Sequence, residues 1–337
     1  MSSMPDRPRP SRRGLTGALA LAAAAVLALG GCTASGVSSD AGAEGSDGPV
    51  SLTVARGQVN IENSLIADEQ GFFEDEGLDV ALEVSQGAAA TNSAVISGEF
   101  DIALTDAIAA TRAISEGMPI VVVSGQKYAD PEHPLESGVL LPPGSPVTDW
   151  ADLEGKKVGI PDLGGLPQLT VLRAMEENGL DADSVEFVAL PLPALAEAAA
   201  KGEVDAIFVF SVFYFTATAN GFTPLGTGVS EFLPDSPQSV WIASRQFAEE
   251  NPETIERFRA ALDAANAFGV ENEDAVRAVY HENTEMPAEF IDNVMVLAPL
   301  STELPQDGWE LLIDVMVDNG ELPEALEYDE IVWEGAR

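Results

Sequence analysis

Residues 98–104 read Gly-Glu-Phe-Asp-Ile-Ala-Leu, and residues 202–209 repeat the pattern as Gly-Glu-Val-Asp-Ala-Ile-Phe-Val. In each segment a glycine is followed by a short apolar run. A glycine of this kind suits the end of a helix, and the run suits a buried parallel strand. The pattern therefore predicts a helix followed by a strand at both places.

Two further pairs of segments recur in the same order and at nearly the same offset. They are residues 77–84 with 179–189, and residues 52–55 with 157–160. Three matching pairs of segments in the same order predict two lobes with the same α/β topology, although such short segments can also recur by chance.

The repeat also indicates where a ligand would bind. In open α/β sheets ligands bind outside the carboxyl ends of the parallel strands. The loops that should line a cleft are those after Ala55, Val84, Leu104, Ile160, Ala189 and Val209.

Composition narrows the classes of function. The 337 residues include 16 Lys+Arg and 56 Asp+Glu, which gives a formal net charge of −40. A chain this acidic repels the phosphate backbone of nucleic acids, and we therefore expect no nucleic-acid partner. The single Cys excludes a cysteine metal cluster, and the two His, far apart in the sequence, disfavour a Ser-His, Cys-His or zinc enzyme, so we expect no metal and no cofactor.

The N-terminus is typical of an exported protein. Arginines within residues 1–13 precede an apolar run over residues 15–29, which is shorter than the ~20 residues of a membrane span. Residues 1–31 are therefore predicted to be a signal peptide. Residues 11–15 also resemble part of a twin-arginine signal, and the choice between that route and the general one stays open.

The segment Leu29-Gly30-Gly31-Cys32 resembles a bacterial lipobox. The resemblance implies cleavage before Cys32 and lipid attachment to its sulfur, which would hold the protein at the outer face of the cell membrane. A signal peptide with an incidental Cys is the alternative. Residues 32–50 would then form the lipidated Cys and a flexible tether.

Several segments are similar to those of one family of transport proteins. They are residues 65–80, residues 152–159 (Asp-Leu-Glu-Gly-Lys-Lys-Val-Gly), residues 202–206 and residues 251–253 (Asn-Pro-Glu). In these segments the chain resembles the nitrate/sulfonate/taurine and thiamine-precursor-binding branch of the substrate-binding proteins of ABC importers. The resemblance covers about residues 51–320.

This resemblance implies a type II periplasmic-binding-protein fold, in which two α/β lobes are joined by a two-strand hinge. Lobe 1 would comprise residues 51–140 plus 240–337, and lobe 2 residues 141–239. The hinge strands are expected at Gly138–Leu141 and Ser239–Ala243. In this family the lobes close on a small solute and present it to a permease with its ATPase.

Candidate site residues in lobe 1 follow its strands. Arg56 could clamp an anion or form a structural ion pair, and Gln58 and Asn60 could bind a ligand, although Asn60 could equally cap a helix. Gly87, Ala88 and Ala89 open a helix whose N–H groups could accept an anion or carbonyl, or could simply pack closely. Thr105 and Asp106 follow the next strand, and Asp106 could bind an amine or ring N–H or act as an N-cap.

Candidate residues in lobe 2 are Gly164, Gly165 and Leu166, and then Phe210, Ser211 and Tyr214. The aromatic side chains could stack on a planar ligand, or they could all be core. Here the run over residues 208–215 replaces a Glu-Pro pair that many family members carry, so the ligands of those members do not transfer directly.

We therefore expect a monomeric solute receptor rather than an enzyme. Its solute would be a small organic molecule with a planar or apolar body and one anionic or polar end near Arg56 or residues 87–90. The alternatives are an enzyme on the same fold, of the thiamine-pyrimidine or menaquinone-pathway type, and a ligand-sensing partner of a membrane receptor. The sequence does not identify the solute.

Overall fold

A computed structural model describes residues 48–57, 62–85, 87–132, 137–226, 228–293, 295 and 300–337. The predicted signal peptide, the tether up to residue 47, Cys32, Gln58 and Asn60 lie outside the described residues.

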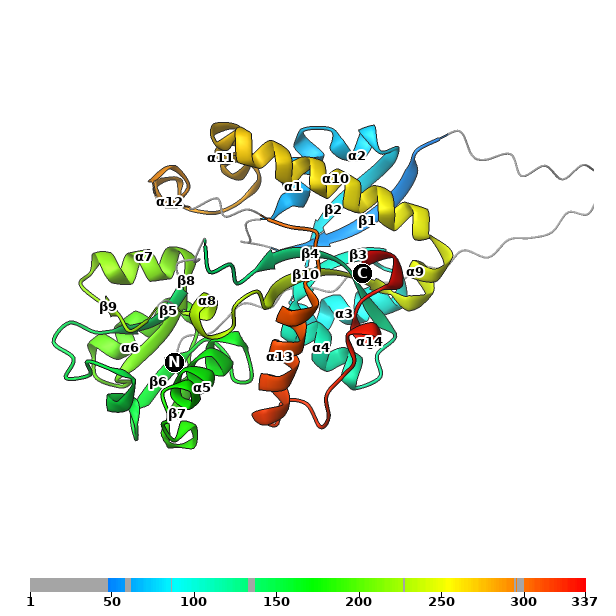
Figure 1. The fold of residues 1–337 in the computed structure, drawn as a ribbon. Helices are drawn as coiled ribbons and strands as arrows, with labels where there is room; N and C mark the ends of the chain where they lie inside the picture. Colours follow the sequence, from blue (N-terminus) through cyan, green and yellow to red (C-terminus); the bar gives the residue numbers. More distant parts are fainter. Residues whose placement is uncertain are drawn as a thin grey trace, which may run out of the picture. The chain divides into compact units, whose positions relative to one another are not determined.

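Two five-stranded sheets form the framework (Figure 1). The first has the order β2-β1-β3-β10-β4, and the second has the order β7-β6-β8-β5-β9. The strands of the first sheet are β1 (Val50–Arg56), β2 (Leu78–Val84), β3 (Ile102–Asp106), β4 (Ile120–Tyr128) and β10 (Pro237–Ser244). Those of the second are β5 (Ser137–Leu141), β6 (Lys157–Ile160), β7 (Glu186–Ala189), β8 (Ala206–Phe210) and β9 (Thr223–Pro224).

The sheet topology confirms the internal repeat. The three repeated segments form β1, β2 and β3 in the first sheet and β6, β7 and β8 in the second, where they hold the same places in the strand order. Within each trio the pairing is parallel, with β1 or β6 in the middle. The chain therefore has the predicted α/β architecture, with two sheets of one plan.

The repeated glycines have a shared physical reason. Gly77, Gly98, Gly179 and Gly202 have φ of 70°, 74°, 71° and 74°, each just after a helix. A left-handed residue at this point closes a helix end, and glycine adopts it without a Cβ clash.

Helices connect the strands. They are α1 (Asn63–Glu69), α2 (Phe72–Asp75), α3 (Ala88–Ser97), α4 (Ala107–Ser115), α5 (Leu166–Glu177), α6 (Leu195–Ala200), α7 (Ser211–Ala219), α8 (Val229–Phe232), α9 (Arg245–Glu250), α10 (Pro252–Glu271), α11 (Glu273–Asn283), α12 (Ala288–Asn293), α13 (Gln306–Asp318) and α14 (Tyr328–Ile331). In the described part of the chain, no helix combines the length and apolar composition of a membrane span.

Each sheet packs against its own helices. On the first sheet, Trp241 of β10 makes an edge contact with Phe258 of α10, and Phe258 stacks on Phe73 of α2. On the second, Ile207 of β8 belongs to a buried cluster with Ala198 of α6 and Ala217 of α7. Such close packing holds the strand ends in place.

The segments predicted as hinge strands, residues 138–141 and 239–243, are strands within β5 and β10. The chain changes sheets just before each of them, after Tyr128 and again before Pro237. These two crossings are hydrogen-bonded to each other. The Ala129 amide donates to the Ser236 carbonyl at 3.0 Å, and the Asp235 amide donates to the Ala129 carbonyl at 2.8 Å.

Candidate functional site at the strand ends

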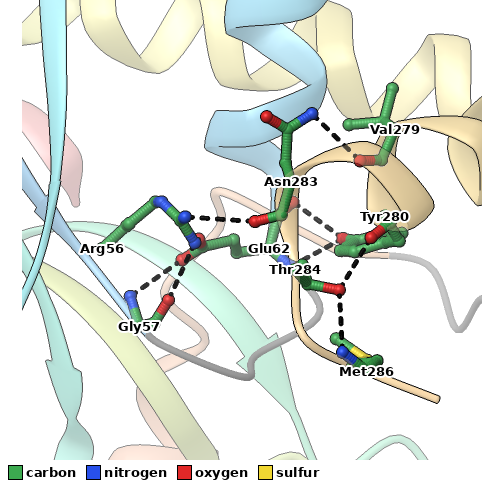
Figure 2. A network of polar contacts seen from close by, with 8 residues as sticks. All are labelled: Arg56, Gly57, Glu62, Val279, Tyr280, Asn283, Thr284 and Met286. Atoms are coloured by element: carbon green, nitrogen blue, oxygen red, sulfur yellow. Dashed lines mark hydrogen bonds and ion pairs between the residues drawn. The ribbon is translucent and has the colours of Figure 1, made fainter.

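Arg56 ends β1, and its guanidinium donates three hydrogen bonds to protein groups (Figure 2). Nη1 donates to the Gly57 carbonyl at 3.1 Å and to Glu62 Oε1 at 3.4 Å, and Nη2 donates to the Asn283 carbonyl at 3.2 Å. The Arg56 side chain is 14% exposed and that of Glu62 is 0% exposed. The structure thus shows the ion pair that the sequence left as one of two roles for Arg56.

Glu62 is the buried centre of this network. Its Oε2 accepts from the Gly57 amide at 3.2 Å, its own amide donates to Tyr280 Oη at 2.7 Å, and Tyr280 Oη donates back to the Glu62 carbonyl at 2.9 Å. Burial raises the pKa of Glu62 to about 7, although Gly57 and Arg56 oppose the shift. The network ties the end of β1 to α11.

The loop after β2 is open to solvent. Gly87 has φ of 113°, and its carbonyl accepts from both the amide and the hydroxyl of Thr91 at 2.9 Å. Ala88 is half-buried and Ala89 is exposed. The small residues therefore leave the start of α3 accessible, as a ligand-binding loop requires. The contacts in this loop do not indicate which ligand would bind.

Asp106 ends β3 and caps α4. Its Oδ1 accepts from the Ala109 amide at 2.9 Å, so the N-cap role is confirmed. The residue is exposed to solvent. Surrounding protein nevertheless raises the pKa of Asp106 to about 6 by desolvation, with a further rise from the charge of Asp162 and an opposing effect of Arg112. An accessible carboxylate with a raised pKa is typical of a recessed site.

Thr105 precedes Asp106 and is buried, and its hydroxyl has no hydrogen-bond partner among the described residues. The same is true of Asn92 Oδ1 in α3. Buried polar atoms are normally paired, so two unpaired oxygens near one strand end are unusual.

The loop after β6 carries Asp162, Gly164 and Gly165, and then Leu166 begins α5. The Gly164 amide donates to Gln168 Oε1 at 2.8 Å, and its carbonyl accepts from Arg112 Nη2 of α4 at 3.0 Å. Arg112 Nη2 also donates to Glu321 Oε2 at 2.7 Å. The Gly164 loop is therefore held by a residue of α4, the helix that connects β3 and β4 of the first sheet.

The strand β8 ends at Phe210, and Ser211 opens α7 with φ of 53°. A positive φ is costly for a serine and is characteristic of functional loops. Tyr214 is half-buried and packs against the core of the second sheet, with its ring 6.0 Å from that of Phe215. Tyr214 is thus partly core, and Phe210 is the more open aromatic.

Exposed large apolar side chains gather at these strand ends. Val84 is 40% exposed at the end of β2, Leu163 is 61% exposed after β6, and Phe210 is 39% exposed at the end of β8. Apolar surface at strand ends suits the body of an organic ligand.

Lys127 of β4 was not predicted as a site residue. It is half-buried, burial lowers its pKa to about 8, and no described residue forms an ion pair or hydrogen bond with its ammonium group. A signal was present, since Lys127 is the lone charge at the end of the apolar segment 120–128. Asp162 was missed as well, although it lies two residues after the end of β6.

A cavity of about 400 Å³ lies elsewhere, over the outer side of β8 between α6 and α7. Its wall is mainly apolar and includes Leu192, Val209, Phe213 and Phe222. None of the predicted site residues lines this cavity.

The two sheets of one plan define a type II periplasmic-binding-protein fold, and known proteins share it. The model of the NMT1/THI5-like family matches residues 58–275, and the chain belongs to that family. A Bacillus subtilis protein named as a binding protein, YtlA, is 24% identical over 282 residues, which cover 79% of this chain and 82% of that protein.

Solved structures agree on the fold. The periplasmic aliphatic sulphonate binding protein SsuA from Escherichia coli has a TM-score of 0.72 at 19% identity, and the match covers 85% of this chain and 92% of SsuA. The desulfurization enzyme DSZB has a TM-score of 0.62 at 18% identity, with 85% and 97% covered. Binding proteins and an enzyme thus share this architecture.

Proposed function

We propose that the protein is a lipid-anchored extracytoplasmic receptor that binds a small organic solute between two lobes and delivers it to an ABC importer permease. Lobe 1 would comprise residues 51–140 and 240–337, and lobe 2 residues 141–239. The solute would contact the predicted residues that follow the strands of both sheets, Phe210 and Asp106 among them.

The observation that carries this proposal is the chemistry of the strand ends. Exposed Val84, Leu163 and Phe210 offer apolar cover, and Asp106 offers an accessible charge, at the edge where α/β sheets bind ligands. A pocket of mainly apolar surface with few polar groups is the usual form of a small-molecule site.

A second candidate function is an enzyme, which the shared fold of DSZB favours. The two differ in one observable. A receptor releases its solute unchanged, so solute recovered after prolonged incubation with the protein should keep its mass. Stoichiometric or catalytic conversion of a bound solute would identify an enzyme instead.

The anchor has its own test at Cys32. The only Cys of the chain lies in the lipobox-like segment, so Cys32→Ala should move the protein from the membrane fraction to the soluble fraction. Fractionation and acyl labelling of both proteins measure this change. A variant that still sediments with membranes and keeps its label contradicts the lipid anchor.

A further inference from the structure

Two charged residues of the first sheet lie in one lateral row. Ser239 of β10 is in register with Asp106 of β3 on one side and with Lys127 of β4 on the other. Since neighbouring strands are about 4.8 Å apart, the Cα atoms of Asp106 and Lys127 are roughly 10 Å apart. Asp106 is the last residue of β3 and Lys127 the last but one of β4, and they lie at the same edge of the sheet because β3 and β4 are each antiparallel to β10.

A bulge shapes this row. Ser239 pairs with Lys127 and Val240 pairs with Gly125, so Gln126 is an extra residue on β4. The Ser239 hydroxyl donates to Gln126 Oε1. Bulges re-aim side chains and are frequent beside binding sites. At this bulge the Ser239 hydroxyl is hydrogen-bonded to Gln126, not to the ammonium of Lys127.

Neither Asp106 nor Lys127 forms an ion pair with a described residue, although the Ala109 amide donates to Asp106. The Lys127 ammonium has no polar partner among the described residues, and burial alone lowers its pKa. The charged groups that act on Asp106 are Asp162, which raises its pKa, and Arg112, which lowers it. Arg112 is already paired with Glu321. A partly desolvated charge without a counter-charge is costly, and a ligand of opposite charge relieves the cost.

A buried amide oxygen without a partner among the described residues lies near Asp106. The Ala109 amide donates to Asp106, and the Ala109 carbonyl accepts from Asn92 Nδ2 at 3.5 Å, which places the Asn92 amide against the same turn. The other end of that amide, Oδ1, is buried and has no partner in the described structure, and the same holds for the Thr105 hydroxyl. The Asn92 oxygen therefore lacks a donor, whereas the Thr105 hydroxyl can donate as well as accept and, as the strand neighbour of Asp106, points to the opposite face of the sheet.

We propose, on the basis of the proposed function, that the solute is a zwitterion with an N–H cation at Asp106 and an anionic group at Lys127. The apolar body between them would be covered by Phe210 and Leu163. This assignment places the anionic end of the solute at Lys127 rather than at Arg56. The Arg56 guanidinium already donates hydrogen bonds to Glu62 and to the carbonyls of Gly57 and Asn283.

Three matched probes test the assignment by titration calorimetry on the full chain purified in detergent. They are 4-(aminomethyl)benzoate, which carries both charges, benzylamine and benzoate. The zwitterion should bind at least tenfold more tightly than either relative. Its affinity should be highest between pH about 6 and about 8, because Asp106 becomes protonated below this range and Lys127 loses its proton above it.

Two variants separate the ends. Asp106→Asn keeps an N-cap residue and should weaken the zwitterion and benzylamine at least tenfold, with benzoate unchanged. Lys127→Gln should weaken the zwitterion and benzoate, with benzylamine unchanged. Asp149→Asn, at the exposed cap of residues 150–153, and Lys156→Gln, a half-buried lysine of the second lobe, are the matched controls and should change none of the affinities.

The charge assignment is overturned if benzoate binds as tightly as the zwitterion, if the zwitterion does not bind at millimolar concentration, or if Lys127→Gln has no effect. Tight binding of benzoate would be consistent with the proposed function, because the protein would still bind a small organic solute and release it unchanged. Conversion of a bound probe to product would contradict the proposed function, while the two variants would still decide the charge assignment.

Discussion

The two sheets have one strand order but different chemistry at their carboxyl edges. The first edge presents the charges of Asp106 and Lys127 together with the exposed apolar side chain of Val84, and its Arg56–Glu62 pair is buried. The second edge presents apolar surface at Leu163 and Phe210, with Asp162 as its acidic exception. The comparison teaches that a repeated framework preserves glycines and buried strands, while the residues just beyond the strands are free to diverge. A solute held by both edges would receive its charged contacts from the first sheet and apolar cover from both sheets.

The largest change in unfolding free energy is expected for Phe208 of β8, and a much smaller change for Phe210 at the end of the same strand. Phe208 of β8 is buried and Phe210, two positions later, is 39% exposed. Phe208→Ala should cost about 3–5 kcal/mol of unfolding free energy, because it leaves a cavity in the core. Phe210→Ala should cost less than about 1 kcal/mol, yet weaken 4-(aminomethyl)benzoate binding by roughly tenfold.

Chemical denaturation and titration calorimetry on both variants measure this contrast. The two residues have the same type, strand and sheet face, so each serves as the control for the other. Equal losses of stability would mean that Phe210 belongs to the core and that the apolar edge does not exist as described.

A somewhat smaller effect should appear at the charged edge as a pH dependence of stability. The pKa of Glu62 is raised from 4.5 to about 7 in the folded protein. Between these values the folded protein holds a proton that the unfolded chain releases, so the unfolding free energy falls as the pH rises. At about 1.4 kcal/mol per pKa unit, the loss is roughly 3 kcal/mol.

Glu62→Gln removes this proton uptake, so the wild type should lose stability relative to the variant as the pH rises from about 4.5 through about 7. Denaturation at a series of pH values gives the difference curve. Glu186→Gln, in the exposed Lys157–Glu186 pair of the second sheet, is the control and should follow the wild type. A flat difference curve for Glu62→Gln contradicts a raised pKa at this site.

Much of the framework could be predicted from the sequence, because it depends on local requirements. A left-handed helix end selects glycine, and a buried parallel strand selects an apolar run, so Gly98 and Gly202 with their following strands reveal the repeat. The same logic identified Asp106, whose place after a strand favours either a ligand-binding carboxylate or an N-cap, and the structure shows the N-cap.

The partners of the site residues could not be predicted in the same way. Arg56 reaches the carbonyl of Asn283, 227 positions away, and no local pattern encodes that contact. Lys127 lies in one row with Asp106 only because β10 inserts between β3 and β4 with a bulge. Register between distant strands is set by tertiary packing, so which charges are paired and which remain open emerged from the structure.

The central claim is that a solute is held by the strand ends of both lobes, and domain closure tests it most directly. Small-angle neutron scattering of the full chain in contrast-matched detergent, with and without saturating 4-(aminomethyl)benzoate, measures the radius of gyration. A ligand that contacts both lobes must favour the closed form, so the account predicts a smaller radius with the probe bound. An unchanged radius at saturation would contradict it.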